Sequence, residues 1–388
     1  MGAERMESVS TSFFGNGAVE GLTEELKKKN VKRALIVTDR FLFENKTADK
    51  VGRALLNGNV EYAIYYHVQP NPTVEVVEEC IEAAKALNVE WLVAVGGGSA
   101  IDTAKAVSIV LANGGKVEDY EGVNKSKLQG LPIAAVNTTA GTGSEVTTFY
   151  IVTNTKKHSK MCMNDVNCKV SIAVNDTQFM LEMPKGLTAA TGMDALTHAI
   201  EALMSRRATP LTDKDALWAI TAIKDNLSKA VACGSDQTAR DMMAYAEYTA
   251  GMAFSNGGLG MVHAMAHALG GFYNLPHGVC NALLLPLVME FNGQTNCAQI
   301  PFQKLGKALE IESACRSTGQ ENVRKCVEFV KALSEKVGIP KNLRELNVQP
   351  NDFEALAKLA LKDVCMLDNC VMPTLQQVID VYRQAYTA

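Results

Sequence analysis

Two hydrophobic patterns alternate along the first half of the chain. Apolar runs of strand length end in polar or glycine residues, and segments with helical periodicity separate them. Over residues 73–88, for example, the apolar side chains recur every three to four positions. Strand alternating with helix predicts a parallel sheet covered by helices on both faces. The expected strands lie within residues 33–39, 60–67, 89–99 and 131–144.

The pattern changes near Leu187. From there the chain consists almost entirely of helical segments joined by short turns, including amphipathic stretches at 321–338 and 352–364. Residues 280–291 are apolar enough to form a buried helix. We therefore expect an α/β domain over residues 1–185 and an all-helical domain over residues 186–388.

Composition narrows the class of protein. The chain has 388 residues, of which 47% are hydrophobic, and a net charge of −4, so it can bury large cores and gives no reason to expect a nucleic-acid partner. No apolar run reaches the roughly 18 residues of a membrane span, and the first ten residues lack the apolar core of a secretory leader. The ten cysteines form no CxxC pair. We expect a cytoplasmic protein with reduced, mostly buried thiols.

Glycines 96–98 and Ser99 lie where a predicted strand passes into a helix. Such a turn lets backbone N–H groups approach a phosphate, but taken alone it is more typical of an ordinary tight turn. Two further strand ends favour a dinucleotide. Asp39 could bind a ribose diol, or simply cap a helix, and residues 137–145 add hydroxyls and glycines. The carboxylate precedes the glycines, unlike the usual fingerprint order.

Four of the six histidines fall within one 80-residue stretch. Asp194 and His198 are four residues apart, as are His263 and His267, and His277 follows between a proline and a glycine. On a helix, residues four apart share a face. Imidazoles with one carboxylate suit Fe(II), Zn, Co, Ni or Mn, so the set predicts a metalloenzyme. Spacing leaves open whether His263 or His267 is the ligand.

These motifs together resemble those of a known family. The segments VGGGSAIDTAKA, NTTAGTGSE, LTAATGMDALTHAIEA, GLGMVHAMAHALGG and PHGVCNA occur in the order found in the iron-containing (group III) alcohol dehydrogenases. The resemblance spans essentially the whole chain and is greatest to the branch with 1,3-propanediol dehydrogenase, lactaldehyde reductase and the methanol dehydrogenases of bacilli. It implies a Rossmann-like N-terminal domain, a helical C-terminal domain and an active site in the cleft between them.

The resemblance also implies roles for individual residues. Asp194, His198, His263 and His277 would be the metal ligands, for Fe2+ or another divalent ion such as Zn2+. His267 would lie beside the nicotinamide as a proton relay. Family members are dimers or larger, so a homo-oligomer is expected. The implied NAD(H) contacts are Asp39, Asn71, Gly97, Gly98, Ser99, Asp102, Thr138, Thr139, Thr142 and Lys160.

The substrate is less well defined. Where many relatives carry an Asn-Pro-Arg segment, this chain reads CMLDNCVMPTLQQ. Phe149, Phe254 and Cys365 are expected to line the pocket, which would accept propanediol, butanol, methanol or a substituted aldehyde. We expect hydride transfer between NAD(H) and a small alcohol or aldehyde, mainly as aldehyde reduction in fermentative metabolism. An anionic substrate, such as a sulfonated aldehyde, is an alternative.

Two other enzyme classes agree less well with the sequence. A metal- and NAD-dependent lyase of the dehydroquinate synthase type would need a basic pocket, whereas the segments between the candidate ligands are apolar and alanine-rich. A metallohydrolase would need a general-base carboxylate. Glu201 is the only obvious candidate, and helix packing or a surface position explains it more simply.

Overall fold

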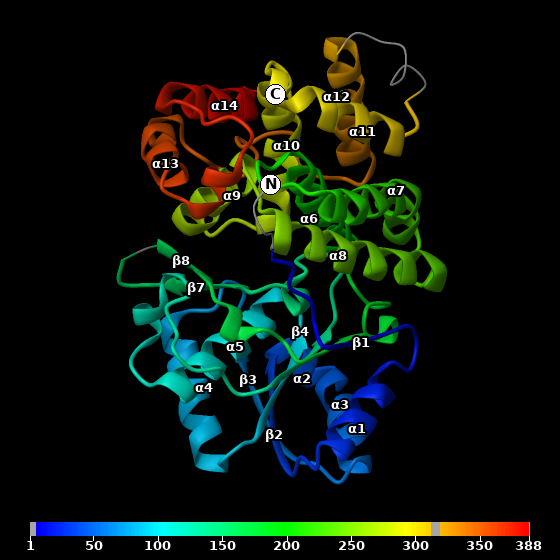
Figure 1. Cartoon of the computed structure of the whole chain (residues 1–388), viewed down its shortest axis with the longest axis vertical. Coiled ribbons are helices and arrows are strands. Elements are labelled where there is room, and N and C mark those ends of the chain that lie inside the picture. The colour runs from blue at the N-terminus through cyan, green and yellow to red at the C-terminus, as the bar shows by residue number, and fades with distance from the viewer. Residues whose placement is uncertain (1–4, 158, 312–318, 388) are drawn as a thin grey trace. The chain divides into compact units, whose positions relative to one another are not determined.

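The computed structural model describes residues 5–157, 159–311 and 319–387 (Figure 1). The chain forms two compact units. We call residues 7–139 and 143–182 the sheet unit. We call the helical unit the described part of residues 183–388 together with residues 5–6 and 140–142.

A six-stranded parallel sheet forms the centre of the sheet unit, in the order β1-β9-β6-β4-β2-β3. All four predicted strands are present. Sequence patterns missed β1 and β9, which are only four residues long and therefore too short to show a period. The strands are β1 (Thr11–Phe14), β2 (Arg33–Asp39), β3 (Glu61–Val68), β4 (Trp91–Gly96), β6 (Ile133–Asn137) and β9 (Ile172–Asn175).

Helices cover both faces of this sheet, as its apolar strands require. Successive residues of β2 point to opposite faces, so Leu35 and Val37 join one core while Ala34 and Ile36 join the other. The first core contains residues of α4 and α5, and the second contains residues of α1 and α3. The helices are α1 (Val19–Lys28), α2 (Arg40–Glu44), α3 (Thr47–Asn57), α4 (Val74–Leu87) and α5 (Gly98–Asn113).

A smaller three-stranded sheet, in the order β5-β8-β7, was not expected from the sequence. Its strands are β5 (Gly122–Val123), β7 (Phe149–Asn154) and β8 (Ser159–Asn164), with β7 and β8 antiparallel. This sheet carries two of the residues predicted from the family resemblance, Phe149 at the start of β7 and Lys160 on β8.

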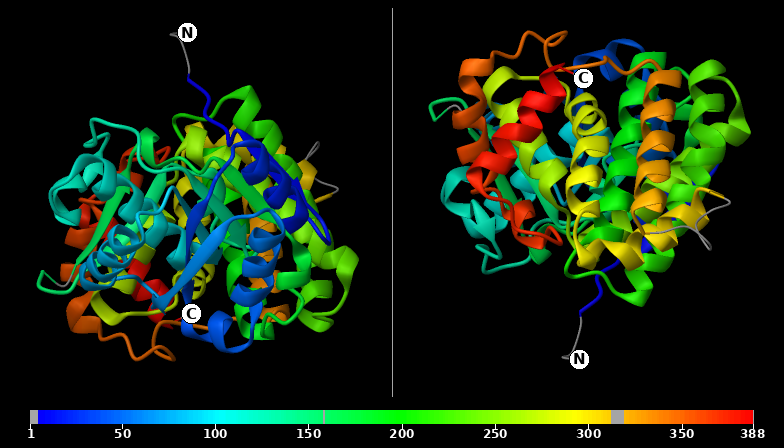
Figure 2. Two further views of the ribbon diagram at one scale, coloured as in Figure 1. Left: turned by 90° about the horizontal axis from the view of Figure 1, so that it is seen from below. Right: turned by 90° about the horizontal axis from the view of Figure 1, so that it is seen from above.

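Every regular element described after residue 183 is helical (Figure 1). Figure 2 shows these helices from a second direction in its right-hand panel. The predicted buried helix at 280–291 is confirmed as part of α10. The α-helices are α6 (Lys185–Met204), α7 (Pro210–Ala232), α8 (Gln237–Gly257), α9 (Met261–Tyr273), α10 (His277–Gly293), α11 (Gln299–Ala308), α12 (Gly319–Lys336), α13 (Phe353–Ala360) and α14 (Leu375–Thr387).

Helix α6 is the buried centre of the helical unit. Sixteen of its twenty residues are buried, and it packs against α7, α8 and α10. A helix that is apolar on all sides has to be enclosed in this way, and its many alanines let neighbouring backbones come close. Any polar side chain on α6 is therefore held in a dry and crowded environment. Within the described residues, no helix is long and apolar enough to cross a membrane.

Candidate metal and cofactor sites

Three helices of the helical unit bring the predicted metal ligands together. Asp194 and His198 lie one turn apart on α6 and are almost fully buried. His263 is in the first turn of α9 and is 1% exposed. Asn274 ends α9 in the left-handed conformation. Pro276 is the N-terminal cap of α10, and His277 is the first residue of that helix. This short turn between α9 and α10 places His277 next to Asp194 of α6.

The ligand atoms of Asp194, His263 and His277 lie within 4.8 Å of one another, and His198 adjoins this group through ring stacking. Asp194 Oδ1 lies 3.6 Å from His277 Nε2 and 3.9 Å from His263 Nε2. The His198 ring stacks on His263 with 4.5 Å between centroids, and its Nδ1 is 3.2 Å from the carbonyl oxygen of Gly141. A carbonyl only accepts, so His198 Nδ1 must donate, which leaves its Nε2 with a free lone pair.

Asn281, one turn after His277 on α10, lies among these atoms. Its amide nitrogen is 2.6 Å from Asp194 Oδ1 and 3.1 Å from the Nε2 atoms of both His263 and His277. One amide has two hydrogens and here faces three acceptors. The carboxylate oxygen and imidazole nitrogens that meet here are atom types that bind a divalent cation.

Burial controls the charge of this cluster. It lowers the pKa of His198 and of His263 well below the usual value, and the neighbouring histidines add to the effect. Both imidazoles are therefore neutral near pH 7, the form that binds metals. One carboxylate and three imidazoles, without a thiolate, fit a borderline ion such as Fe2+ or Zn2+.

Glu201 was predicted to be a helix-packing residue or a surface charge, and its burial excludes the surface position. It is 5% exposed, one turn beyond His198, and its Oε2 is 2.5 Å from His263 Nδ1. Burial raises its pKa, whereas the backbone N–H donors at Val262, His263 and Gly260 stabilise the ionised carboxylate. The spacing of three residues from His198 was the only available signal, because the sequence could not show that this face of α6 is enclosed.

His267 lies in a second group with Asp363 and Cys365. Its Nδ1 is 2.8 Å from Asp363 Oδ2, and its ring stacks on His277 at 5.2 Å. Burial would raise the pKa of Asp363, but the charge and hydrogen bond of His267 and the backbone N–H of Cys365 lower it to about 2. Nothing in the sequence indicated Asp363 as the partner of His267, 96 positions away.

Two of the predicted pocket residues belong to the same unit. Phe254 is buried on α8, and its ring stacks on His198 at 4.3 Å. Cys365 is 4% exposed beside Asp363. Phe149, the third predicted residue, belongs to the sheet unit, where its carbonyl oxygen accepts a hydrogen bond from Lys105.

The glycine turn of the sheet unit is shaped for close backbone approach. Gly96 has φ 154°, and a Cβ on Gly97 would lie 2.8 Å from the side chain of Thr139. Gly98 and Ser99 follow as the first residues of α5, and the N-terminal cap of this helix has no side-chain hydrogen bond. Such a helix start offers backbone N–H groups to a phosphate.

Asp39 ends β2 and caps α2, one of the two roles considered from the sequence. Its Oδ1 accepts a hydrogen bond from the N–H of Leu42 at 2.8 Å. This contact uses one carboxylate oxygen at the carboxyl end of β2, so capping does not exclude binding a ribose diol.

The remaining predicted cofactor residues are distributed around these strand ends. Asn71 Oδ1 accepts from Lys160 Nζ at 2.8 Å. Asp102 accepts from the Ser144 hydroxyl and from the N–H of Ile151, and so tethers the segment after β6. Thr138 and Thr139 begin that segment, and Thr142 falls in the short stretch that clusters with the helical unit.

Lys105 is a structural residue that the sequence analysis missed. It is completely buried on α5, and its ammonium donates to the carbonyl oxygens of Ser144, Thr147 and Phe149 at 2.6–2.9 Å. One side chain thereby holds the whole loop that leads into β7. A lysine in a helical pattern is usually exposed, so no local pattern indicated this role.

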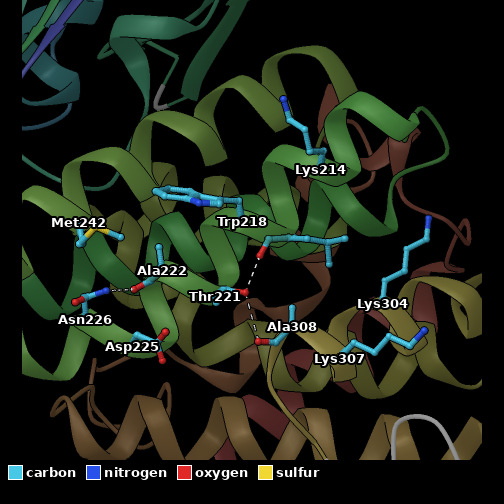
Figure 3. Close-up of a pocket in the computed structure, with 11 residues that line it drawn as sticks. Lys214, Trp218, Thr221, Ala222, Asp225, Asn226, Met242, Lys304, Lys307 and Ala308 are labelled. Carbon is cyan, nitrogen blue, oxygen red and sulfur yellow. Dashed lines mark hydrogen bonds between the residues drawn. The ribbon is translucent and has the colours of Figure 1, made fainter.

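A hollow of about 610 Å³ lies elsewhere on the helical unit, between α7, α8 and α11 (Figure 3). Trp218 and Met242 supply apolar surface, and Lys214, Lys304 and Lys307 surround it. None of the predicted metal, cofactor or pocket residues lines it.

Comparisons with known proteins agree with this arrangement. A family model described as iron-containing alcohol dehydrogenase matches residues 10–177, and one for the C-terminal part of the Fe-containing alcohol dehydrogenase family matches residues 188–386. Alcohol dehydrogenase 4 of Saccharomyces cerevisiae is 46% identical over 376 residues, which are 97% of this chain and 96% of the yeast protein.

Two further relatives cover both chains almost completely. The NAD-dependent methanol dehydrogenase of Bacillus methanolicus is 40% identical over 96% of this chain and 97% of its own. A crystal structure of 1,3-propanediol oxidoreductase superposes with a TM-score of 0.96 at 38% identity, over 99% of this chain and 100% of that one.

Proposed function

Since the chain belongs to the iron-containing alcohol dehydrogenase family, we propose that it uses Fe2+ and NAD(H) to interconvert small alcohols and aldehydes. We further propose that it acts in the cytoplasm, as a homodimer or larger oligomer, mainly as an aldehyde reductase of fermentative metabolism. The observation that carries this proposal is the convergence of the buried carboxylate of Asp194 with the imidazoles of His263 and His277, beside which His198 stacks on His263.

In this proposal Asp194, His198, His263 and His277 hold the metal. When bound, the ion supplies Lewis acidity that favours the alkoxide of an alcohol and polarises the carbonyl of an aldehyde. The protein supplies a dry site, because three of the four side chains are less than 5% exposed. His277 Nε2 and His263 Nε2 face the same oxygen of Asp194, so a small ion can reach all of them.

His267 is proposed to relay the proton. Asp363 accepts from its Nδ1, so the nitrogen that can exchange a proton with the substrate is Nε2. The lowered pKa of Asp363 keeps this carboxylate ionised, which holds the imidazole in one tautomer through the catalytic cycle. Phe254 and Cys365 are proposed to bound the substrate on the side of the histidines, and Phe149 is proposed to complete the pocket.

The sheet unit is proposed to bind NAD(H), which supplies or accepts the hydride. Backbone N–H groups at Gly97, Gly98 and Ser99 would receive the pyrophosphate at the start of α5. Asp39 would accept from the ribose diol and repel a 2′-phosphate, which favours NAD(H) over NADP(H). Asn71, Asp102, Thr138, Thr139, Thr142 and Lys160 are proposed to complete the binding surface.

The test is NADH oxidation by the Fe2+-loaded protein against a panel of neutral and anionic aldehydes, with NADPH and metal-free protein as controls. Metal-dependent oxidation of NADH supports the proposal, and the best substrate defines the pocket, including whether it accepts a sulfonated aldehyde. If no aldehyde is reduced by protein that binds both metal and NAD, the lyase alternative is favoured instead. His267→Asn should slow turnover while the metal content stays unchanged.

A further inference from the structure

We propose that Glu201 is a positioning residue that holds His263 in the tautomer and orientation in which its Nε2 can bind the metal. The inference rests on the proposed metal site. Glu201 is on α6 and His263 is on α9, so the contact joins two helices that are 62 positions apart along the chain at this point. The two carboxylate oxygens have different partners, and each constrains a different degree of freedom of α9.

The first oxygen fixes the start of α9. Glu201 Oε1 accepts from the backbone N–H of Val262 at 2.6 Å. The residue that precedes this helix is Gly260, which has no side chain to cap it. A Cβ on Gly260 would lie 2.9 Å from Glu201 Oε1, so the glycine leaves the space that the carboxylate occupies. Glu201 thus caps α9 from a neighbouring helix and satisfies a donor that the helix itself leaves unpaired.

The second oxygen fixes the ring of His263. Glu201 Oε2 is 2.5 Å from His263 Nδ1. The same carboxylate is held in place by the backbone N–H of Val262. Rotation of the His263 ring would therefore break the hydrogen bond between its Nδ1 and a carboxylate of fixed position. Both constraints act within the first three residues of α9, where Nε2 has to be aimed at Asp194.

The surrounding network determines which nitrogen of His263 carries the proton. The amide nitrogen of Asn281 faces Asp194 Oδ1 at 2.6 Å, so it is the donor end of that amide. The same amide nitrogen is 3.1 Å from His263 Nε2, which must then be an acceptor. The proton of the neutral ring is consequently on Nδ1, where Glu201 accepts it. The Nε2 lone pair is left for a cation.

Glu201 differs from an ordinary buried acid because it contacts a proposed metal ligand. A carboxylate that accepts from a ligating histidine fixes the tautomer and makes the imidazole a better ligand, and removal of such partners weakens metal binding about 10–100-fold. Helix α9 also carries His267, so the same cap sets the position of the proposed proton relay. Glu201 acts on the metal site through His263.

Glu201→Gln is the sharpest substitution, because it keeps the size of the side chain. Its carbonyl can still cap Val262, but its amide then donates toward His263 Nδ1 and forces the proton onto Nε2. We expect the dissociation constant for Zn2+, measured by chelator competition, to rise about 10–100-fold. Glu201→Asp, which keeps the acceptor, should recover part of the affinity. Glu354→Gln, on the exposed surface of α13, is the matched control and should bind as the wild type does.

The tautomer itself is read without metal, from ¹⁵N NMR of the protein labelled in its six histidines. We expect His263 to be protonated on Nδ1 in the wild type and on Nε2 in Glu201→Gln. Wild-type His263 protonated on Nε2 would overturn the inference even if the variant did not fold, as would a variant that keeps both the tautomer and the affinity. Wild-type protein that binds no metal would instead refute the proposed function.

Discussion

Gly278 offers a direct test of how closely α6 and α10 must approach for the metal site to form. It follows His277 in α10 and lies against the backbone of Ala190 in α6, one turn before Asp194. A Cβ on Gly278 would lie 2.3 Å from the carbonyl oxygen of Ala190, whereas ordinary contacts begin at 3.4 Å. Gly278→Ala therefore requires the backbones of α6 and α10 to move apart by a further 3.4 − 2.3 = 1.1 Å.

This displacement is large compared with the tolerance of metal–ligand distances, but its effect on the stability of the fold is moderate. The obstacle is backbone rather than a flexible side chain, so α10 must move, and His277 moves with it away from Asp194. Metal–ligand distances tolerate only about 0.2 Å. We expect metal binding to weaken by at least about 100-fold, beyond the usual effect of losing a hydrogen-bond partner of a ligand. Overpacking should lower the free energy of unfolding by about 1–3 kcal/mol.

Gly186→Ala is the matched control. Gly186 is in the first turn of α6, and no atom lies within 4 Å of the position that its Cβ would take. There the alanine should raise the stability by about 0.4–1 kcal/mol and leave metal binding unchanged. The assays are chelator competition for Zn2+ and thermal unfolding of the metal-free proteins. Wild-type metal affinity in Gly278→Ala would refute the reasoning, since His277 would then tolerate a shift of its helix.

Three further outcomes are expected. Lys105→Met leaves the carbonyl oxygens of Ser144, Thr147 and Phe149 without their buried donor, and should lower the free energy of unfolding in guanidinium by about 3–5 kcal/mol; a loss below about 1 kcal/mol would contradict this role. Asp39→Asn keeps an acceptor for the N–H of Leu42 but removes the charge, so kcat/KM with NADPH should rise about tenfold, equivalent to about 1.4 kcal/mol. Unchanged discrimination would show that Asp39 is only a helix cap. Chelation of the metal should abolish NADH oxidation and lower Tm, since an ion at 100 times its Kd stabilises the folded state by about 2.7 kcal/mol; activity that survives in protein shown to be metal-free would refute the proposed mechanism.

Much of the fold was accessible from the sequence because its signals are local. Three of the four predicted strands, β2, β4 and β6, are buried on both faces, and this produces continuous apolar runs such as 33–39. The short strands β1 and β9 and the separate sheet β5-β8-β7 escaped, because pairing between distant segments defines them rather than any periodicity of their own. The helical half was evident from its period alone.

The candidate ligands were visible for the same reason. Asp194 and His198 are recognisable from their spacing of four residues on one helix, and His277 from the proline and glycine on either side of it. Sequence alone therefore determined the alternation of strands and helices and the two pairs of candidate ligands spaced four residues apart. Each of these depends on residues within a few positions of one another.

Only the tertiary structure decided how those side chains are supported. Glu201, Asn281, Asp363 and Lys105 have the same local patterns whether they face solvent or the interior, and each acts through partners that another segment brings to it. The free energy of a buried polar group depends on whether such partners are present, because burial removes its water. Which lysine holds a loop, and which carboxylate orients a ligand, is settled when the helices pack.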